Sequence, residues 1–182
     1  MRISGLALLL TGIPLVTFAQ EFGPAENLAP YIPTPQVIVE KMLESAHVKA
    51  GEVVYDLGSG DGRILFTAAQ EFGARAVGVE ILPELCEKAR DRVRSLGLED
   101  KIRVIQGSAL RVDLSPADVV TMYFLTGSNE RLKPTLEKYL KPGARVVSNQ
   151  FPIKGWKPAS IVHVQDGDME HTIYVYAMVK KK

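Results

Sequence analysis

The stretch VYDLGSGDGR, residues 54–63, joins an apolar run that ends in an acid to three glycines at alternate positions. The apolar run is typical of a short buried strand, and the residues after the glycines are typical of a helix that ends at Gly73. Gly58, Gly60 and Gly62 allow a sharp turn and a close backbone approach to a ligand, whose anionic group the helix N-terminus can receive. A tight strand-to-helix turn without a ligand is the alternative interpretation.

Outward from this stretch, predicted strands and helices alternate along the chain. Strands are expected at residues 51–58, 75–81, 102–107, 117–125, 144–151, 159–164 and 171–179. Helices are expected at residues 35–46, 62–73, 82–98 and 128–140. This order predicts an α/β fold with a Rossmann-like, open twisted, mostly parallel seven-stranded sheet and helices on both faces. The last two strands lack an intervening helix, so a C-terminal antiparallel hairpin is expected.

Two helix details can be predicted from single residues. Thr34 is expected to cap the first helix, with Pro35 at its first helical position, where a missing N–H costs nothing. Pro134 is expected to divide the last helix into two pieces.

Length and composition limit the number of domains and the kinds of partner that the chain can have. A chain of 182 residues with 46% hydrophobic residues is long enough for one well-buried domain, expected at residues 31–182 and as a monomer. A formal charge of +1 gives no broad basic field, which makes nucleic acid a poor first guess for a partner. The single cysteine, Cys86, cannot form an internal disulfide, and no Cys/His cluster has metal-ligand spacing, so no metal is expected.

The N-terminal residues 1–19 differ from the rest of the chain. Arg2 precedes a nearly continuous apolar run, and Thr17 and Ala19 are small residues at the positions that a signal peptidase inspects. This pattern predicts a cleaved secretory signal and an exported or periplasmic protein. A membrane anchor is the alternative, since the run is near the lower length limit for a spanning helix. Residues 20–30, which contain several Gly and Pro, are expected to be a linker.

An acid at the end of the second predicted strand narrows the choice of ligand. Glu80 lies about 20 residues beyond the glycines, where a carboxylate can accept hydrogen bonds from ribose hydroxyls. The glycines follow a G-x-G-x-G pattern, with Asp56 two residues before the first of them. A dinucleotide site would instead have G-x-G-x-x-G, so the pattern favours a nucleoside cofactor other than NAD.

DLGSGDG, together with Glu80, resembles the S-adenosylmethionine site of the class I, seven-strand methyltransferases. The resemblance implies that the loop approaches the methionine and adenosyl portions of this cofactor, while Glu80 binds the ribose. Ser108 stands where class I enzymes often have an acid for the adenine amino group. The cofactor-binding residues expected from the resemblance are Asp56, Gly58, Ser59, Gly60, Gly62, Glu80 and Ser108.

A narrower family shares further motifs with residues 30–158. PYIPTPQVIVEKML, VVTMYFL, LKPGARVVS and WKP resemble the protein-lysine methyltransferases of the ATP synthase c-subunit and the adenine nucleotide translocase, with their prokaryotic relatives. The resemblance implies methyl transfer to a lysine amine of a protein by in-line displacement. Thr126 stands where relatives often have proline, and Asn149 where they often have histidine, so chemistry on the acceptor side could differ.

Two tyrosines are the candidate catalytic residues. Tyr123 ends the fourth predicted strand and Tyr31 lies in PYIPTP. Their ring faces can stabilise a cation and their hydroxyls can orient an amine, although ordinary packing is the alternative for each. Cys86 falls on the apolar side of a predicted helix and is expected in the core.

Two other function classes stay open at this point. A small-molecule N-, O- or S-methyltransferase would share every cofactor residue. A non-catalytic S-adenosylmethionine-binding module is the second alternative, because an exported protein would meet little of this cytoplasmic cofactor. The segment after the fourth strand reads MYFLTG and lacks the [N/D]-P-P-[Y/F] signature of amide and exocyclic-base methylation, which disfavours adenine and glutamine as acceptors.

Overall fold

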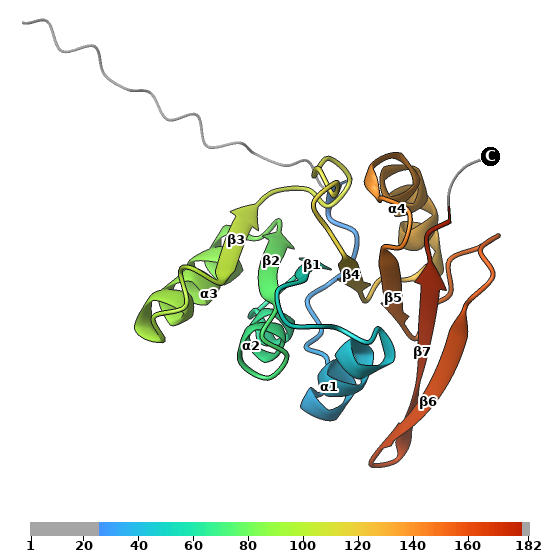
Figure 1. Cartoon of the computed structure of the whole chain (residues 1–182), viewed down its shortest axis with the longest axis horizontal. Helices are drawn as coiled ribbons and strands as arrows, with labels where there is room; N and C mark the ends of the chain where they lie inside the picture. Colours follow the sequence, from blue (N-terminus) through green and yellow to red (C-terminus); the bar gives the residue numbers. More distant parts are fainter. Residues whose placement is uncertain (1–25, 180–182) are drawn as a thin grey trace, which may run out of the picture.

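Seven strands form one sheet in the order β3-β2-β1-β4-β5-β7-β6, as Figure 1 shows. The computed structural model describes residues 26–179. The strands are β1 (Val53–Leu57), β2 (Arg75–Glu80), β3 (Ile102–Gln106), β4 (Val119–Met122), β5 (Arg145–Asn149), β6 (Ser160–Asp166) and β7 (Met169–Ala177). β1 to β5 pair in parallel, whereas β7 runs antiparallel to both β5 and β6. The predicted mostly parallel sheet with a C-terminal hairpin is confirmed.

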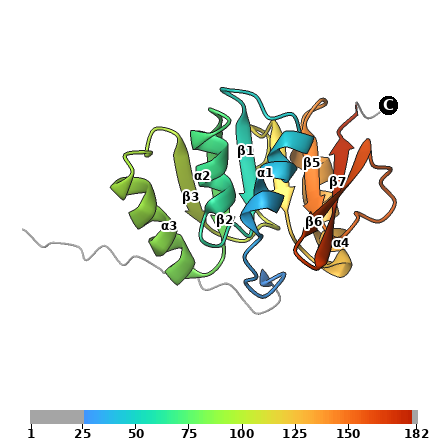
Figure 2. The ribbon, with the colours of Figure 1, turned by 90° about the horizontal axis from the view of Figure 1, so that it is seen from below.

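Within residues 26–179, four helices cover the two faces of the sheet. They are α1 (Gln36–Ser45), α2 (Arg63–Gln70), α3 (Pro83–Ser95) and α4 (Thr126–Tyr139). The first three lie on one face, where Met42 and Leu65 pack with Val54, and α4 lies on the other, where Leu136 packs with Leu57 (Figures 1 and 2). Cys86 of α3 is buried in the first of these two core layers, as expected.

The direction in which strands are added reverses at β1. β2 and β3 follow on one side of it, while β4 and β5 extend the sheet on the other. Such a reversal leaves a crevice at the carboxyl ends of the two central strands, and open α/β sheets bind their ligands there. The glycines after β1 therefore lie at the place where a ligand is expected.

The prediction that Thr34 caps α1 is wrong. The N-cap is Pro35, whose carbonyl accepts hydrogen bonds from the N–H groups of Ile38 and Val39, both at 3.0 Å. The Thr34 carbonyl instead accepts a hydrogen bond from Arg63 Nη1 at 2.5 Å. Thr34 thus belongs to the segment before the helix, and its hydroxyl makes no cap.

The predicted break at Pro134 is also wrong, because α4 is one continuous helix that includes this proline. A proline inside a helix costs about 3 kcal/mol through a lost hydrogen bond and a steric clash. Leu132 and Leu136 lie on either side of it and are fully buried, and each contributes about 1.5–3 kcal/mol by its burial. Burial of this face offsets the cost, and Glu130, whose carbonyl loses its helical donor, is an exposed residue.

The predicted signal segment, residues 1–19, lies outside the described residues, as does most of the predicted linker. Within residues 26–179, no helix has both the length and the apolar character needed to cross a membrane.

Candidate functional site

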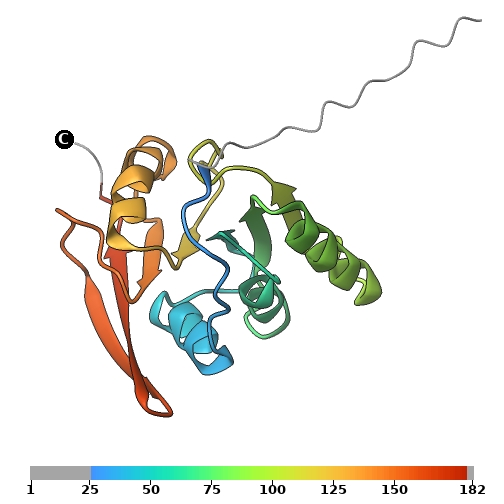
Figure 3. The same cartoon turned by 180° about the vertical axis from the view of Figure 1, so that it is seen from behind.

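A pocket lies at the carboxyl ends of β1, β2 and β4. Its walls come from residues 56–61 at the end of β1 and in the loop that follows, residues 79–82 at the end of β2, and Tyr123 and Phe124 after β4. Residues 26–34, called the strap below, form a further wall, and Arg63, Gly107 and Ala109 complete the lining. The strap crosses the central strands before it enters α1, as Figure 3 shows from behind. The pocket therefore coincides with the crevice that the strand order predicts.

Two of the loop glycines have left-handed backbones that aromatic rings cover closely. Gly58 and Gly60 have φ angles of 72° and 54°, which residues other than glycine rarely adopt. A Cβ at Gly60 would lie 2.5 Å from Cε2 of Tyr31, and one at Gly58 would lie 2.9 Å from Cζ of Phe124. Gly62 is the left-handed N-cap of α2 and does not line the pocket itself. A larger residue at Gly58 or Gly60 would therefore force these rings away from the loop.

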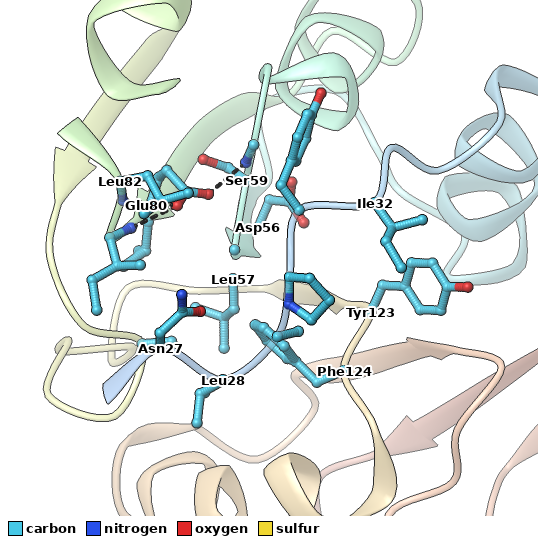
Figure 4. A pocket seen from close by; sticks show the side chains of 18 of the residues that line it. Asn27, Leu28, Ile32, Asp56, Leu57, Ser59, Glu80, Leu82, Tyr123 and Phe124 are labelled. Carbon is cyan, nitrogen blue, oxygen red and sulfur yellow. Dashed lines mark hydrogen bonds between the residues drawn. The ribbon is translucent and has the colours of Figure 1, made fainter. Parts of the chain in front are cut away.

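Glu80 connects the glycine loop to the end of β2. Its Oε2 accepts a hydrogen bond from the N–H of Gly60 at 2.8 Å. Its Oε1 accepts from the N–H groups of Ile81 and Leu82 at 2.8 and 2.9 Å. A carboxylate offers about four acceptor positions, so Oε2 keeps one for a further donor. Glu80 is 6% exposed and faces the pocket, as Figure 4 shows, which suits a ribose hydroxyl.

Asp56 lies at the centre of the pocket, between Glu80 and Tyr123 (Figure 4). Thr121 Oγ1 donates a hydrogen bond to its Oδ1 at 2.8 Å. Burial raises the pKa of Asp56 to about 7, with a further rise from the nearby Glu80 carboxylate that the Thr121 bond opposes. A carboxylate in this position can pair with a positive group on a ligand.

Replacement of Asp56 by asparagine is expected to change how stability depends on pH. The pKa of Asp56 is raised from 3.8 to about 7 in the folded chain, so the folded state binds a proton that the unfolded state has lost between these values. The free energy of unfolding therefore falls as pH rises through this window, by up to about 4 kcal/mol in total. Asp56→Asn can keep the Thr121 bond and should remove this pH-dependent part of the free energy of unfolding. Urea unfolding at pH 5 and at pH 7.5 measures the change. The same change in the free energy of unfolding between pH 5 and pH 7.5 in wild type and variant would contradict this prediction.

The strap is attached to the body of the fold at several points. Besides the Arg63 bond to the Thr34 carbonyl, Ser128 Oγ donates to the Leu28 carbonyl at 2.6 Å, and Glu26 pairs with Arg111. Arg63 also pairs with Asp61 at 2.7 Å, and its hydrogen bond holds the pKa of that carboxyl below the usual range.

Tyr31 brings the predicted aromatic ring from the strap to the glycine loop. Burial, followed by the nearby Asp61 carboxylate, raises the pKa of its hydroxyl, so the phenol stays protonated at neutral pH. The ring lies against Gly60, and the hydroxyl interacts with Asp61 and Arg63.

Tyr123 lies at the opposite end of the pocket from Glu80 (Figure 4). Its ring stacks on that of Phe151, with centroids 6.2 Å apart and planes inclined by 21°. The structure thus brings both candidate tyrosines to the pocket, one against the glycine loop and one at the far end.

Ser108 is not brought into the pocket. It is 3% exposed, and its hydroxyl accepts a hydrogen bond from the N–H of Leu110 at 3.3 Å. The neighbouring Gly107 and Ala109 line the pocket instead. Any contact from this turn to a ligand therefore falls to these two residues. Asn149 is likewise fully buried, and its Oδ1 lies 3.4 Å from Nδ1 of His171.

Several pocket residues could not be identified from sequence patterns. Phe124 packs on Gly58, Leu82 follows Glu80, and residues 26–30 line the pocket although their composition is that of a linker. The VVTMYFL motif contains Phe124, whereas the burial of Leu28 is apparent only in the structure.

The pocket residues fit a nucleoside cofactor with a positively charged end. Ser59 lines the pocket, and its Oγ is buried with no hydrogen-bond partner among the described residues. Glu80 has an acceptor position for a ribose, Asp56 can face a cation, and the glycines at the loop give room. Within residues 26–179, no three His, Cys, Asp or Glu side chains are grouped so that they could hold a metal ion.

Comparisons with known proteins agree with this site. The model of a family described as the ANTKMT methyltransferase domain matches residues 56–160. A protein-lysine N-methyltransferase of Saccharolobus islandicus is 49% identical over 84% of this chain and 96% of its own length. The adenine nucleotide translocase lysine N-methyltransferase of Mus musculus is 33% identical over 76% of this chain, and the match spans 60% of that longer protein.

A solved structure shares the fold and carries a ligand. The crystal structure of an RNA methyltransferase from Salinibacter ruber in complex with S-adenosyl-L-homocysteine has 42% sequence identity and a TM-score of 0.77. The alignment covers 83% of this chain and 96% of that one. S-adenosyl-L-homocysteine is S-adenosylmethionine without its transferable methyl group.

Proposed function

The chain belongs to the ANTKMT methyltransferase family and is an S-adenosylmethionine-dependent methyltransferase, and from this premise we propose that it methylates the amine of a lysine side chain in a protein. The proposal draws on the protein-lysine N-methyltransferase of Saccharolobus islandicus, which aligns with this chain over 96% of its own length. The observation that carries it is Tyr123, whose aromatic ring lies at the end of the pocket remote from Glu80.

Within this proposal, the pocket divides into a cofactor part and an acceptor part. Glu80 accepts the ribose hydroxyls, the glycine loop with Ser59 lies along the cofactor, and Asp56 faces its positively charged end. The backbone at Gly107 and Ala109 receives the adenine, because Ser108 lies outside the pocket. Tyr123 then lies on the acceptor side.

The chain contributes position and desolvation to the reaction. When bound, S-adenosylmethionine supplies a methyl group on a positively charged sulfur. A lysine amine has an ordinary pKa of about 10.4 and must lose its proton before it can act as a nucleophile. An apolar surrounding lowers this pKa, and the rings of Tyr31 and Tyr123 with the strap contribute apolar surface to the pocket. Holding the amine in a reactive orientation supplies much of the acceleration.

Tyr123→Phe is expected to lower turnover roughly three- to tenfold, the effect of one lost hydrogen bond of about 0.5–1.5 kcal/mol. Tyr31→Phe is expected to lower it by a similar or smaller factor, since its hydroxyl interacts with Asp61 and Arg63. Both variants keep the rings that line the pocket, so cofactor affinity should persist. Single-turnover rates and calorimetric titration with S-adenosyl-L-homocysteine test this separation. Normal turnover in both variants would rule out the assignment of these tyrosines.

Radiolabelled cofactor and a lysate of the protein's own source test the acceptor class. We expect label in protein, on methylated lysine after acid hydrolysis, and none of it removed by nuclease. Label that nuclease removes would favour RNA, in line with the description of the Salinibacter protein. Label only in small molecules would favour a small-molecule methyltransferase. Binding of cofactor without label in any fraction would favour a non-catalytic binding module.

From the sequence alone we also propose that residues 1–19 direct export of the chain. Their charge and apolar run support it, and they lie outside the described residues. Intact-mass measurement of the native protein should place the mature N-terminus at Gln20. A native protein that still carries residues 1–19 in the membrane fraction would favour the anchor alternative.

A further inference from the structure

Phe151 extends the aromatic surface of Tyr123 beyond the cofactor pocket. The two rings are nearly parallel, and Phe151 is half-buried just after the end of β5. It is not among the residues that line the pocket itself. Glu80 and Tyr123 mark opposite ends of the pocket (Figure 4), so the ring of Phe151, stacked on that of Tyr123, adds apolar surface next to the end remote from Glu80.

The backbone before Phe151 adopts a strained conformation. Gln150 has φ of 64°, a left-handed value that costs a residue with a Cβ roughly 1–2 kcal/mol. Thr172 of β7 holds this conformation, because its carbonyl accepts from the Gln150 N–H at 2.7 Å and its own N–H donates to the Gln150 side chain at 3.2 Å. The Phe151 N–H donates to the Asn149 carbonyl at 2.8 Å, which closes a tight turn. Strain that neighbouring contacts maintain is a feature of functional sites.

Two buried polar side chains fix the carbonyl of Phe151. Asn129 Nδ2 of α4 donates to it at 3.0 Å, and Ser148 Oγ of β5 donates to it at 2.6 Å. Both side chains are fully buried. Buried hydrogen bonds of this kind are costly to leave half-made, so they specify one position of the chain. Two elements from different parts of the chain thus hold one half-exposed phenylalanine next to Tyr123.

We propose that Phe151 forms the outer wall of the acceptor subsite and that Asn129 and Ser148 are its positioning residues. The inference rests on the proposed lysine acceptor. An ammonium near an aromatic face is attracted by the ring, and the aliphatic stem of a lysine packs on apolar surface. A lysine that approaches Tyr123 passes Phe151, which binds its stem and orders its approach without contact to the cofactor.

Phe151→Ala tests the wall. The acceptor is the protein that wild-type enzyme labels most strongly in a source lysate, purified and titrated at saturating cofactor. We expect the half-saturating acceptor concentration to rise about tenfold, with turnover at saturation changed less than about threefold. Cofactor affinity, measured with S-adenosyl-L-homocysteine, should stay at the wild-type value. Phe151→Leu keeps apolar bulk without a ring face and should give an intermediate rise.

Ser148→Ala tests the positioning residues, since it removes one donor to the Phe151 carbonyl without changing the Phe151 side chain itself. A smaller rise in half-saturating acceptor concentration, of about threefold, is expected at unchanged cofactor affinity. A merely structural role would lower the melting temperature without moving this concentration.

Phe72→Ala is the matched control, because Phe72 is also half-buried and packs on the core after α2, at the amino ends of the strands. The Phe72→Ala variant should be less stable than the wild type but have the same half-saturating acceptor concentration. If Phe151→Ala and the wild type have equal half-saturating acceptor concentrations, the inference is overturned while the proposed function stands. Absence of protein label with wild-type enzyme would overturn the proposed function, and the acceptor wall with it.

Discussion

Glu80→Ala is expected to weaken cofactor binding by about ten- to hundredfold, which corresponds to about 1.5–3 kcal/mol for the loss of a charged acceptor. Part of the effect comes from the ribose hydroxyls that lose their partner. The rest comes from the loop, because the same carboxylate accepts the N–H of Gly60 and fixes the turn against β2. The variant should therefore bind weakly and also unfold more easily.

The free energy of unfolding of Glu80→Ala should fall by about 2 kcal/mol or more, since three backbone N–H groups lose their acceptor. Calorimetric titration with S-adenosyl-L-homocysteine and urea unfolding measure the two effects. Glu80→Gln keeps the shape of the side chain and should lose affinity with a smaller loss of stability. Glu87→Ala removes an exposed acid from the middle of α3 and should change neither quantity by much. Wild-type affinity in Glu80→Ala would mean that the ribose binds elsewhere.

Gly60→Ala is expected to disturb the pocket from its other side. The left-handed backbone at Gly60, with φ of 54°, would cost an alanine about 1–2 kcal/mol of stability. Its Cβ would also lie 2.5 Å from the Tyr31 ring, which must leave the loop and loosen the strap. Cofactor affinity should fall about tenfold or more, because the added methyl group fills space at the loop and the ring that covers it is displaced.

A double variant separates the two causes. In Gly60→Ala with Tyr31→Ala the steric conflict is absent and only the backbone strain remains, so the loss of stability should be smaller than the sum of the two single losses. Gly127→Ala is the matched control, since a Cβ there meets nothing within 4 Å and lies in the first turn of α4. It should be neutral or slightly stabilising. Full additivity in the double variant would show that Tyr31 and Gly60 do not meet in solution.

The sheet and the cofactor end of the pocket could be predicted from local sequence. Valine-containing apolar runs indicated each strand, and helical patterns separated β1 from β2, β2 from β3 and β4 from β5. Parallel pairing brings Asp56 and Glu80 to the same edge. The position of Phe151 could not be predicted, because it depends on hydrogen bonds with Asn129, Ser148 and Thr172, which belong to three separate elements. Sequence spacing carries no signal for contacts of this kind.

The strap and the Pro134 helix show the same limit in other ways. Tyr31 reaches Gly60 through the path of the strap, which its Pro-rich composition does not specify. The propensity of Pro134 to break a helix is a local preference, and the burial of Leu132 and Leu136 overrides it. Ser108 follows β3 as expected, but its hydroxyl turns back to the N–H of Leu110.

The position of β7 has a consequence for the order in which the fold can be completed during synthesis. β7 is the last of the described strands to be made, yet it lies between β5 and β6 and pairs with both. Until Met169–Ala177 has been synthesised, β5 presents an unpaired backbone edge that can add to the strand of another chain. The nascent protein therefore carries its greatest risk of aggregation late in translation, when Val147 and its neighbours await their partner strand.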